Sequence, residues 1–121
     1  MPNESRSVKA ARDQVADALT LMGWPEHIID QARVVTSELV TNAVLHAGTG
    51  FELTIRVDDA CFIEVSDGAP ASLPQLADPG EVRPGGMGLY LVAALATEWG
   101  VERDPARKVV WARLSPAGVA V

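Results

Sequence analysis

The period of the hydrophobic residues changes once along this chain, near Gly48 and Gly50, and this change restricts the fold more than any other feature. Before the two glycines, apolar residues recur every three or four positions, which predicts amphipathic helices. The first predicted helix covers residues 8–22 and ends at Gly23, and the second runs from Glu26 to just before Gly48. After the glycines the period becomes two, which is typical of half-buried strands.

The second part of the chain reads as two hairpins separated by a loop and a helix. "FELTIRVD" (residues 51–58) and "CFIEVS" (61–66) predict the first hairpin. Residues 67–84 are broken by proline and glycine, and a loop of this length is more often a lid or binding loop than a simple connector. A helix is then predicted through "GGMGLYLVAALATEWG" to Gly100, and "WGVER" and "KVVWARL" predict two closing strands.

This order of elements predicts an α+β fold: a two-layer α/β sandwich with helices on one face of a mostly antiparallel sheet. A chain of 121 residues suits a single domain spanning residues 1–121. The net charge of −6 argues against non-specific binding to nucleic acid or to anionic membranes. Neither an apolar leader nor a membrane-spanning run is visible, so we expect a cytoplasmic protein. The single cysteine, Cys61, excludes an internal disulfide and is expected to be a buried strand residue.

Three polar side chains stand four residues apart in "SELVTNAVLHA", namely Glu38, Asn42 and His46. Successive members advance by about 40° around a helix, so they form a ladder about 12 Å long beside its apolar face. A carboxylate and an amide there are suited to Mg²⁺ or to proton transfer. The alternative is an ordinary helix whose polar residues pair with each other at the edge of the core.

Two further motifs lie downstream. Gly85, Gly86 and Gly88 lead directly into a helix, where backbone N–H groups and the helix dipole favour an anion. The motif is neither a Rossmann fingerprint nor a Walker loop, because no strand precedes it and no Gly-Lys-Ser/Thr follows. Asp67 ends an apolar strand, where a carboxylate can accept a hydrogen bond from a ligand or simply begin a turn.

The order of these motifs resembles that of the GHKL ATPases, which have a Bergerat-type α/β sandwich. The resemblance covers nearly the whole chain and is most specific in "VVTSELVTNAVLHA" and "GMGLYLVAALATEWGV". Within that superfamily the chain is most similar to the small anti-sigma-factor serine/threonine kinases of the RsbW/SpoIIAB type. This resemblance therefore implies a Bergerat ATP-binding fold with ATP and Mg²⁺ as cofactors.

The resemblance assigns roles to individual residues. It implies that Asn42 ligates Mg²⁺, that Glu38 is the general base, and that Asp67 accepts a hydrogen bond from the adenine amino group. The backbone of Gly86 and Gly88 would hold the phosphates. It further implies that the remaining members of the nucleotide-binding set are His46, Gly68, Arg83, Met87 and Leu89.

The implied function is an ATP-dependent serine/threonine kinase that phosphorylates a STAS-type anti-sigma-factor antagonist and sequesters a sigma factor. A homodimer is also expected from the resemblance. One alternative stays open: a nucleotide-binding or partner-binding module of the same fold without catalysis. It is suggested by Ala69, Pro70 and Ala71 after Asp67, because the family usually has glycines in this turn. A plain ATP hydrolase is disfavoured, because no transducing domain is visible.

Overall fold

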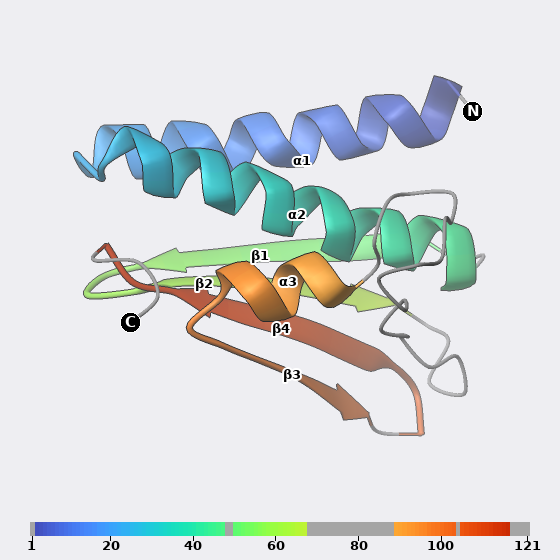
Figure 1. The fold of residues 1–121 in the computed structure, drawn as a ribbon. Coiled ribbons are helices and arrows are strands. Elements are labelled where there is room, and N and C mark those ends of the chain that lie inside the picture. The colour runs from blue at the N-terminus through green and yellow to red at the C-terminus, as the bar shows by residue number, and fades with distance from the viewer. Residues whose placement is uncertain (1, 48–49, 68–88, 104, 117–121) are drawn as a thin grey trace.

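The computed structural model describes residues 2–47, 50–67, 89–103 and 105–116 (Figure 1). Along the chain the elements are α1 (Pro2–Leu21), α2 (Glu26–Ala47), β1 (Phe51–Val57), β2 (Cys61–Asp67), α3 (Leu89–Leu95), β3 (Glu98–Arg103) and β4 (Lys108–Leu114). The two long helices and the four strands confirm the predictions from periodicity, apart from shifts at their ends. Among the described residues, no helix is both long enough and apolar enough to cross a membrane.

The four strands form one antiparallel sheet in the order β1-β2-β4-β3. β2 is therefore a central strand, and its last residue, Asp67, stands opposite Phe51 of β1 and Lys108 of β4. α1 and α2 lie together over one face of the sheet, and α3 packs beside α2 (Figure 1). This arrangement confirms the predicted α+β sandwich.

The core fills the layer between the helices and the sheet. Alternate residues of β2 and β4 are buried, so each strand turns one row of side chains towards the helices and the other row away. Burying one large aliphatic side chain stabilises a fold by roughly 1.5–3 kcal/mol, so this layer holds the helices on the sheet. The large apolar side chains that are fully buried are Val15, Leu19, Ile28, Val35, Leu39, Val40, Ile63, Val65, Val92 and Leu114.

A Schellman turn at Gly23 ends α1. The φ of Gly23 is +76°, a backbone conformation that glycine adopts without steric cost. The N–H of Gly23 donates to the carbonyl of Thr20 at 3.0 Å, and the N–H of Trp24 donates to the carbonyl of Leu19 at 3.1 Å. These two bonds satisfy carbonyls at the end of the helix, so Gly23 stops α1 where the sequence predicted.

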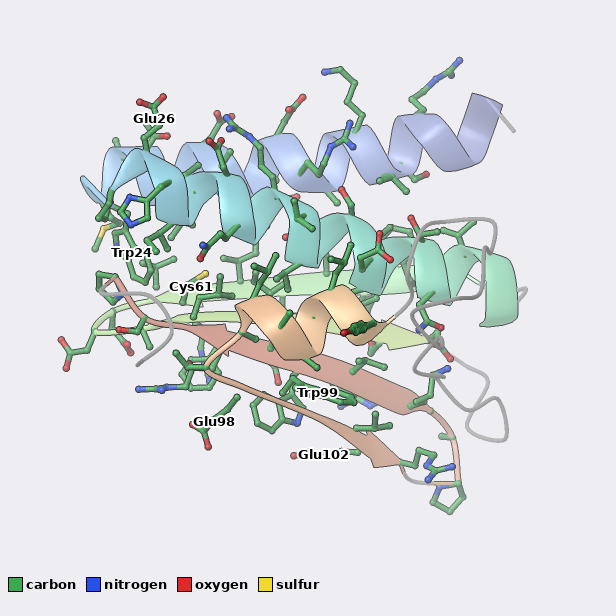
Figure 2. The ribbon with its side chains drawn as sticks, in the orientation of Figure 1. Trp24, Glu26, Cys61, Glu98, Trp99 and Glu102 are labelled. Carbon is green, nitrogen blue, oxygen red and sulfur yellow. The ribbon has the colours of Figure 1, made fainter. Side chains whose placement is uncertain are left out.

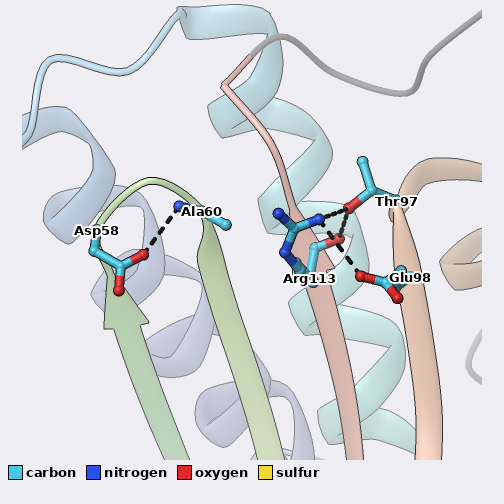
Figure 3. Close-up of polar contacts among 5 residues, drawn as sticks. All are labelled: Asp58, Ala60, Thr97, Glu98 and Arg113. Atoms are coloured by element: carbon cyan, nitrogen blue, oxygen red, sulfur yellow. Dashed lines mark hydrogen bonds and ion pairs between the residues drawn. The ribbon is translucent and has the colours of Figure 1, made fainter.

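A tight turn joins β1 to β2 and fixes their register. The N–H of Ala60 donates to Oδ1 of Asp58 at 3.1 Å (Figure 3), and the N–H of Asp58 donates to the carbonyl of Ala60 at 3.0 Å. Val57 then pairs with Cys61, and the same register continues to the far end of the hairpin, where Phe51 meets Asp67. The turn therefore sets which residue stands beside Asp67.

The third helix is shorter than predicted, because α3 ends at Leu95 and not at Gly100. The amide of Thr97 donates to the carbonyl of Arg113 in β4 at 2.8 Å, and the Thr97 hydroxyl donates to the same oxygen at 2.7 Å. The Arg113 guanidinium lies 3.5 Å from the Glu98 carboxylate (Figure 3). The prediction of a longer helix was wrong because pairing with β4 replaces helical hydrogen bonds from Thr97 onwards.

Candidate functional site

The polar ladder of α2 lies at the margin of the core. Glu38 and Asn42 are one helical turn apart, and only 8% and 6% of their surfaces are exposed. Their neighbours Leu39 and Ala43 belong to the hydrophobic core. The predicted position of these two side chains, beside the apolar face of the helix and away from solvent, is therefore confirmed.

The side-chain oxygen of Asn42 has an unusual environment. Oδ1 is buried, and it has no hydrogen-bond partner among the residues that the structure describes. Leaving a buried acceptor unsatisfied costs about 1–3 kcal/mol, so such atoms are rare in native proteins. An amide oxygen is also a ligand type that Mg²⁺ accepts. Asn42 therefore fits a bound cation or a ligand that donates a hydrogen bond.

The ladder reaches the end of the sheet where β2 finishes. The chain leaves α2 at Ala47 and enters β1 at Phe51, and Phe51 pairs with Asp67. α3 begins at the same end of the molecule, with Leu89 (Figure 1). The fold therefore brings together the end of α2, the end of β2 and the start of α3, which the sequence motifs had marked separately.

Asp67 forms a buried ion pair with Lys108. Nζ of Lys108 lies 3.4 Å from Oδ2 of Asp67, and each side chain is only 1% exposed. The two residues are direct partners across the β2–β4 ladder. A charge is rarely buried unless an opposite charge accompanies it, so each group is the electrostatic partner that permits the burial of the other.

Sequence reasoning did not assign a role to Lys108, although a signal was present. In "KVVWARL", every second residue from Lys108 onwards has its side chain on the same face of the strand. These residues are Lys108, Val110, Ala112 and Leu114, and all four are buried on the helix side of the sheet. Strand alternation thus predicts an inward-facing lysine at the start of β4. Only the pairing of β4 with β2 identifies Asp67 as its partner.

Asp67 also lines an open cavity of about 410 Å³ at this end of the sheet. Phe51 and Arg107 also line this cavity. The other lining residues among those described are Gly50, Glu52 and Ser66. A cavity of this size is in the range of small-molecule sites, and such sites combine apolar walls with a few polar groups.

A family model described as the histidine kinase-like ATPase domain matches residues 1–114. The chain belongs to this family. Membership implies that the domain binds ATP, and it confirms the resemblance to the GHKL ATPases at the level of the superfamily. A search among curated proteins finds no match. The assignment of a single domain over residues 1–121 stays a prediction.

Part of the predicted nucleotide site of this ATPase domain lies outside the described residues. These positions are Gly68, Arg83, Gly86, Met87 and Gly88, together with the rest of the predicted lid after Asp67. The backbone of His46 belongs to the last turn of α2 and that of Leu89 begins α3, but their side chains are also outside the described part. The roles of all these residues stay predictions.

The described residues offer the ATPase domain little for a metal site built from protein ligands alone. Within those ranges, no group of three or more His, Cys, Asp or Glu side chains could hold a metal ion. Burial raises the pKa of the Cys61 thiol to about 11, so this sulfur stays neutral at physiological pH. Mg²⁺ in nucleotide sites needs only one or two protein oxygens, because phosphates and water complete its shell. The buried oxygen of Asn42 fits this kind of site.

Proposed function

We propose that this chain is an ATP- and Mg²⁺-dependent serine/threonine protein kinase that acts as an anti-sigma factor. It phosphorylates a STAS-type anti-sigma-factor antagonist, and it sequesters a sigma factor. The observation that carries the proposal is the buried Asn42 oxygen, one turn from the buried Glu38, in an ATPase domain. The choice of partners, and of a homodimer, rests on the resemblance of "SELVTNAVLHA" and "GMGLYLV" to that group.

The described residues suggest how the nucleotide would be held. Oδ1 of Asn42 would ligate the Mg²⁺, which when bound neutralises charge on the phosphates. Asp67 would accept an N–H bond from the adenine amino group at the cavity beside Phe51. The adenine end and the phosphate end would then be fixed by residues from β2 and α2. Phosphoryl transfer depends mainly on such positioning and charge neutralisation.

Glu38 would act as the general base. The hydroxyl oxygen of the substrate Ser or Thr attacks the γ-phosphorus while the bond from that phosphorus to the bridging oxygen of ADP breaks. The hydroxyl proton passes to the Glu38 carboxylate, and ADP leaves. Glu38 stands one turn before Asn42 on α2, so the base and the proposed metal ligand belong to one rigid element.

Calorimetric titration with ATP in the presence of MgCl₂ tests the binding half of the proposal. The wild-type chain should bind ATP, and Asn42→Ala should lose at least about tenfold in affinity, because a ligand of the cation is removed. Thr41→Ala is the matched control, since Thr41 is the preceding, half-buried residue of the same helix. Absence of heat at millimolar ATP would contradict the proposal.

Phosphate transfer to a panel of purified STAS-domain proteins tests the catalytic half. Glu38→Gln should bind ATP as the wild type does, yet lose about 10²–10⁴-fold in transfer rate, because the base is absent. Glu26→Gln replaces an exposed acid of the same helix and should leave the rate unchanged. Equal loss of ATP binding and transfer in Glu38→Gln would argue against the role of Glu38 as base.

The second candidate is a nucleotide-binding or partner-binding module that does not transfer phosphate. It is favoured by Ala69, Pro70 and Ala71, whose side chains and proline ring stiffen a turn that is usually glycine-rich in this superfamily. ATP binding by the wild-type chain without transfer to any member of the panel would support this candidate over the kinase.

A further inference from the structure

Two strands form the edges of the sheet. The order β1-β2-β4-β3 leaves β1 and β3 outermost, and among the described strands each has a neighbour on one side only (Figure 1). An edge strand presents backbone N–H and C=O groups that can pair with another strand. We propose that β1 pairs with β1 of a second copy of this chain, antiparallel and about a two-fold axis at Thr54. The inference rests on the homodimer in the proposed function, and it gives that homodimer a surface.

The apolar side of β1 is incompletely covered. Residues along β1 alternate between half-buried and exposed, whereas those along β2 and β4 alternate between buried and half-buried. A strand added at this edge would remove more of the apolar row of β1 from water, which favours association. The residues of this row pack against the core and are Phe51, Leu53, Ile55 and Val57.

The exposed row of β1 is complementary in charge to itself. It consists of Glu52, Thr54 and Arg56, on the face of the sheet away from the helices. In an antiparallel pair centred on Thr54, Glu52 of each copy stands opposite Arg56 of the other copy. The interface therefore contains two pairs of opposite charges, as a two-fold axis requires of a surface that meets itself. Opposite charges placed directly across a strand pair stabilise it.

Neighbouring registers do not match as well. A shift by one residue would bring the apolar row of one copy to the face that carries the charged row of the other. A shift by two residues in either direction would place each charged side chain opposite an uncharged residue or one of like charge. The register centred on Thr54 instead joins apolar residues on the helix side, and these pairs are Leu53 with Ile55 and Phe51 with Val57.

The other edge of the sheet lacks this property. An antiparallel pair of β3 strands centred on Gly100 would place Glu98 of each copy opposite Glu102 of the other. Like charges directly opposite each other are destabilising. Centred on Val101, the same two strands would contain no pair of opposite charges. Charge therefore favours β1 over β3 as the edge that meets a second copy.

Sedimentation equilibrium of the full chain measures the dissociation constant of the dimer. Arg56→Glu should raise this constant at least about tenfold, because it replaces two attractive pairs by two repulsive ones. Glu52→Arg should have the same effect. The double variant Glu52→Arg/Arg56→Glu exchanges the charges and should recover the wild-type constant to within about threefold. Arg56 also lies over the Phe62 ring, 4.9 Å from its centroid, but both variants that carry Glu at position 56 lose this contact.

A mixture of the two single variants separates pairing from folding. Arg56→Glu and Glu52→Arg should each be largely monomeric alone, and together they should form a heterodimer, because each supplies the charge that the other lacks. Glu102→Arg is the matched control. It makes the same change of charge at an exposed residue of β3, and it should leave the dissociation constant unchanged.

A cross-link tests the register directly. The two copies of Thr54 would face each other at the axis, with their Cα atoms about 4.5–5.5 Å apart, which is within the range of a disulfide. Thr54→Cys should therefore form a covalent dimer on mild oxidation. Asp59→Cys lies in the exposed turn after β1, far from the axis, and should not be linked. The native Cys61 is the only other cysteine, and its burial keeps it from competing.

The outcomes distinguish the inference from the proposed function. If the wild type is a dimer that Arg56→Glu and Glu52→Arg leave unchanged, and Thr54→Cys is not cross-linked, the β1 surface is overturned and the proposed function stands. A wild-type chain that stays monomeric at millimolar concentration overturns the inference together with the homodimer. Titration with ATP decides the rest of the proposed function in either case.

Discussion

Two ion pairs of nearly equal length use residues of β4, and they lie on opposite faces of the sheet. Lys108 and Asp67 are 3.4 Å apart on the helix side, where each side chain is 1% exposed. Arg113 and Glu98 are 3.5 Å apart on the other side, where their side chains are 36% and 64% exposed. In Figure 2 Glu98 lies on the side of the sheet away from the helices. The pairs differ in burial far more than in length, and burial decides their energetics.

An exposed pair contributes little because water and salt screen it, whereas a buried pair is costly to break. A buried pair is nevertheless weak evidence for stability, since apolar residues of similar volume are often as stable or better. Packing alone therefore does not account for Asp67 and Lys108. The contact with adenine proposed for Asp67 would give this buried carboxylate a further role.

Breaking the buried pair should have the largest effect. Lys108→Met should lower the free energy of unfolding by about 3–5 kcal/mol, because the Asp67 carboxylate stays buried without its counter-charge. Urea denaturation followed by circular dichroism measures this loss. The double variant Asp67→Leu/Lys108→Met should recover most of it. A single variant as stable as the wild type would be inconsistent with a buried pair.

Cys61 shows what burial does to an ionisable group without a charged partner. Cys61 and Asp67 are the first and last residues of β2, and both are buried (Figure 2 labels Cys61). Burial raises the pKa of the Cys61 thiol to about 11. At pH 8 iodoacetamide should therefore label the native chain at least about 100-fold more slowly than the urea-unfolded chain, because the thiolate is the reactive form.

The pH dependence of labelling sharpens this prediction. The labelling rate of the native chain should keep rising about tenfold per pH unit beyond pH 9, where the rate of an ordinary thiol levels off. Equal rates for native and unfolded chains at pH 8 would show that Cys61 is not held in the core.

Gly100 tests packing on the same face as the exposed pair. A side-chain carbon added at Gly100 would lie 2.9 Å from the indole ring of Trp111, its partner in the β3–β4 ladder. Gly100→Ala should therefore destabilise the fold by about 1–3 kcal/mol, as overpacking does. Gly50→Ala is the control, because a carbon added there meets nothing within 4 Å. Equal thermal stability of Gly100→Ala and the wild type would mean that Trp111 moves aside freely.

Removing the exposed pair should have the smallest effect. Glu98→Gln should change the free energy of unfolding by less than about 1 kcal/mol, and 1 M NaCl should reduce even that difference. Chemical denaturation at low and high salt measures both quantities. A loss as large as that in Lys108→Met would remove the distinction between the two pairs.

The periodicity of the sequence was sufficient to predict both long helices, all four strands and the sandwich. It was wrong at the end of α3, because the apolar pattern of the helix continues locally to Trp99, whereas Trp99 pairs with Ala112 of β4 as part of β3 in the fold. Of the candidate site, the burial of Glu38 and Asn42 beside the core was predictable from their spacing on one helix. The partner of Asp67 was not predictable, since it lies on β4, more than 40 residues further along the chain.

The sequence by itself therefore determined what depends on near neighbours. It placed Glu38 and Asn42 one turn apart, and it ended α1 at Gly23. It also set the alternation of more and less buried side chains along β2 and β4. All of these features follow from backbone geometry within a few residues. The tertiary structure alone decided which strands are adjacent and in what register. That pairing placed Lys108 opposite Asp67 inside the sheet, where the loss of water makes the two charges dependent on each other.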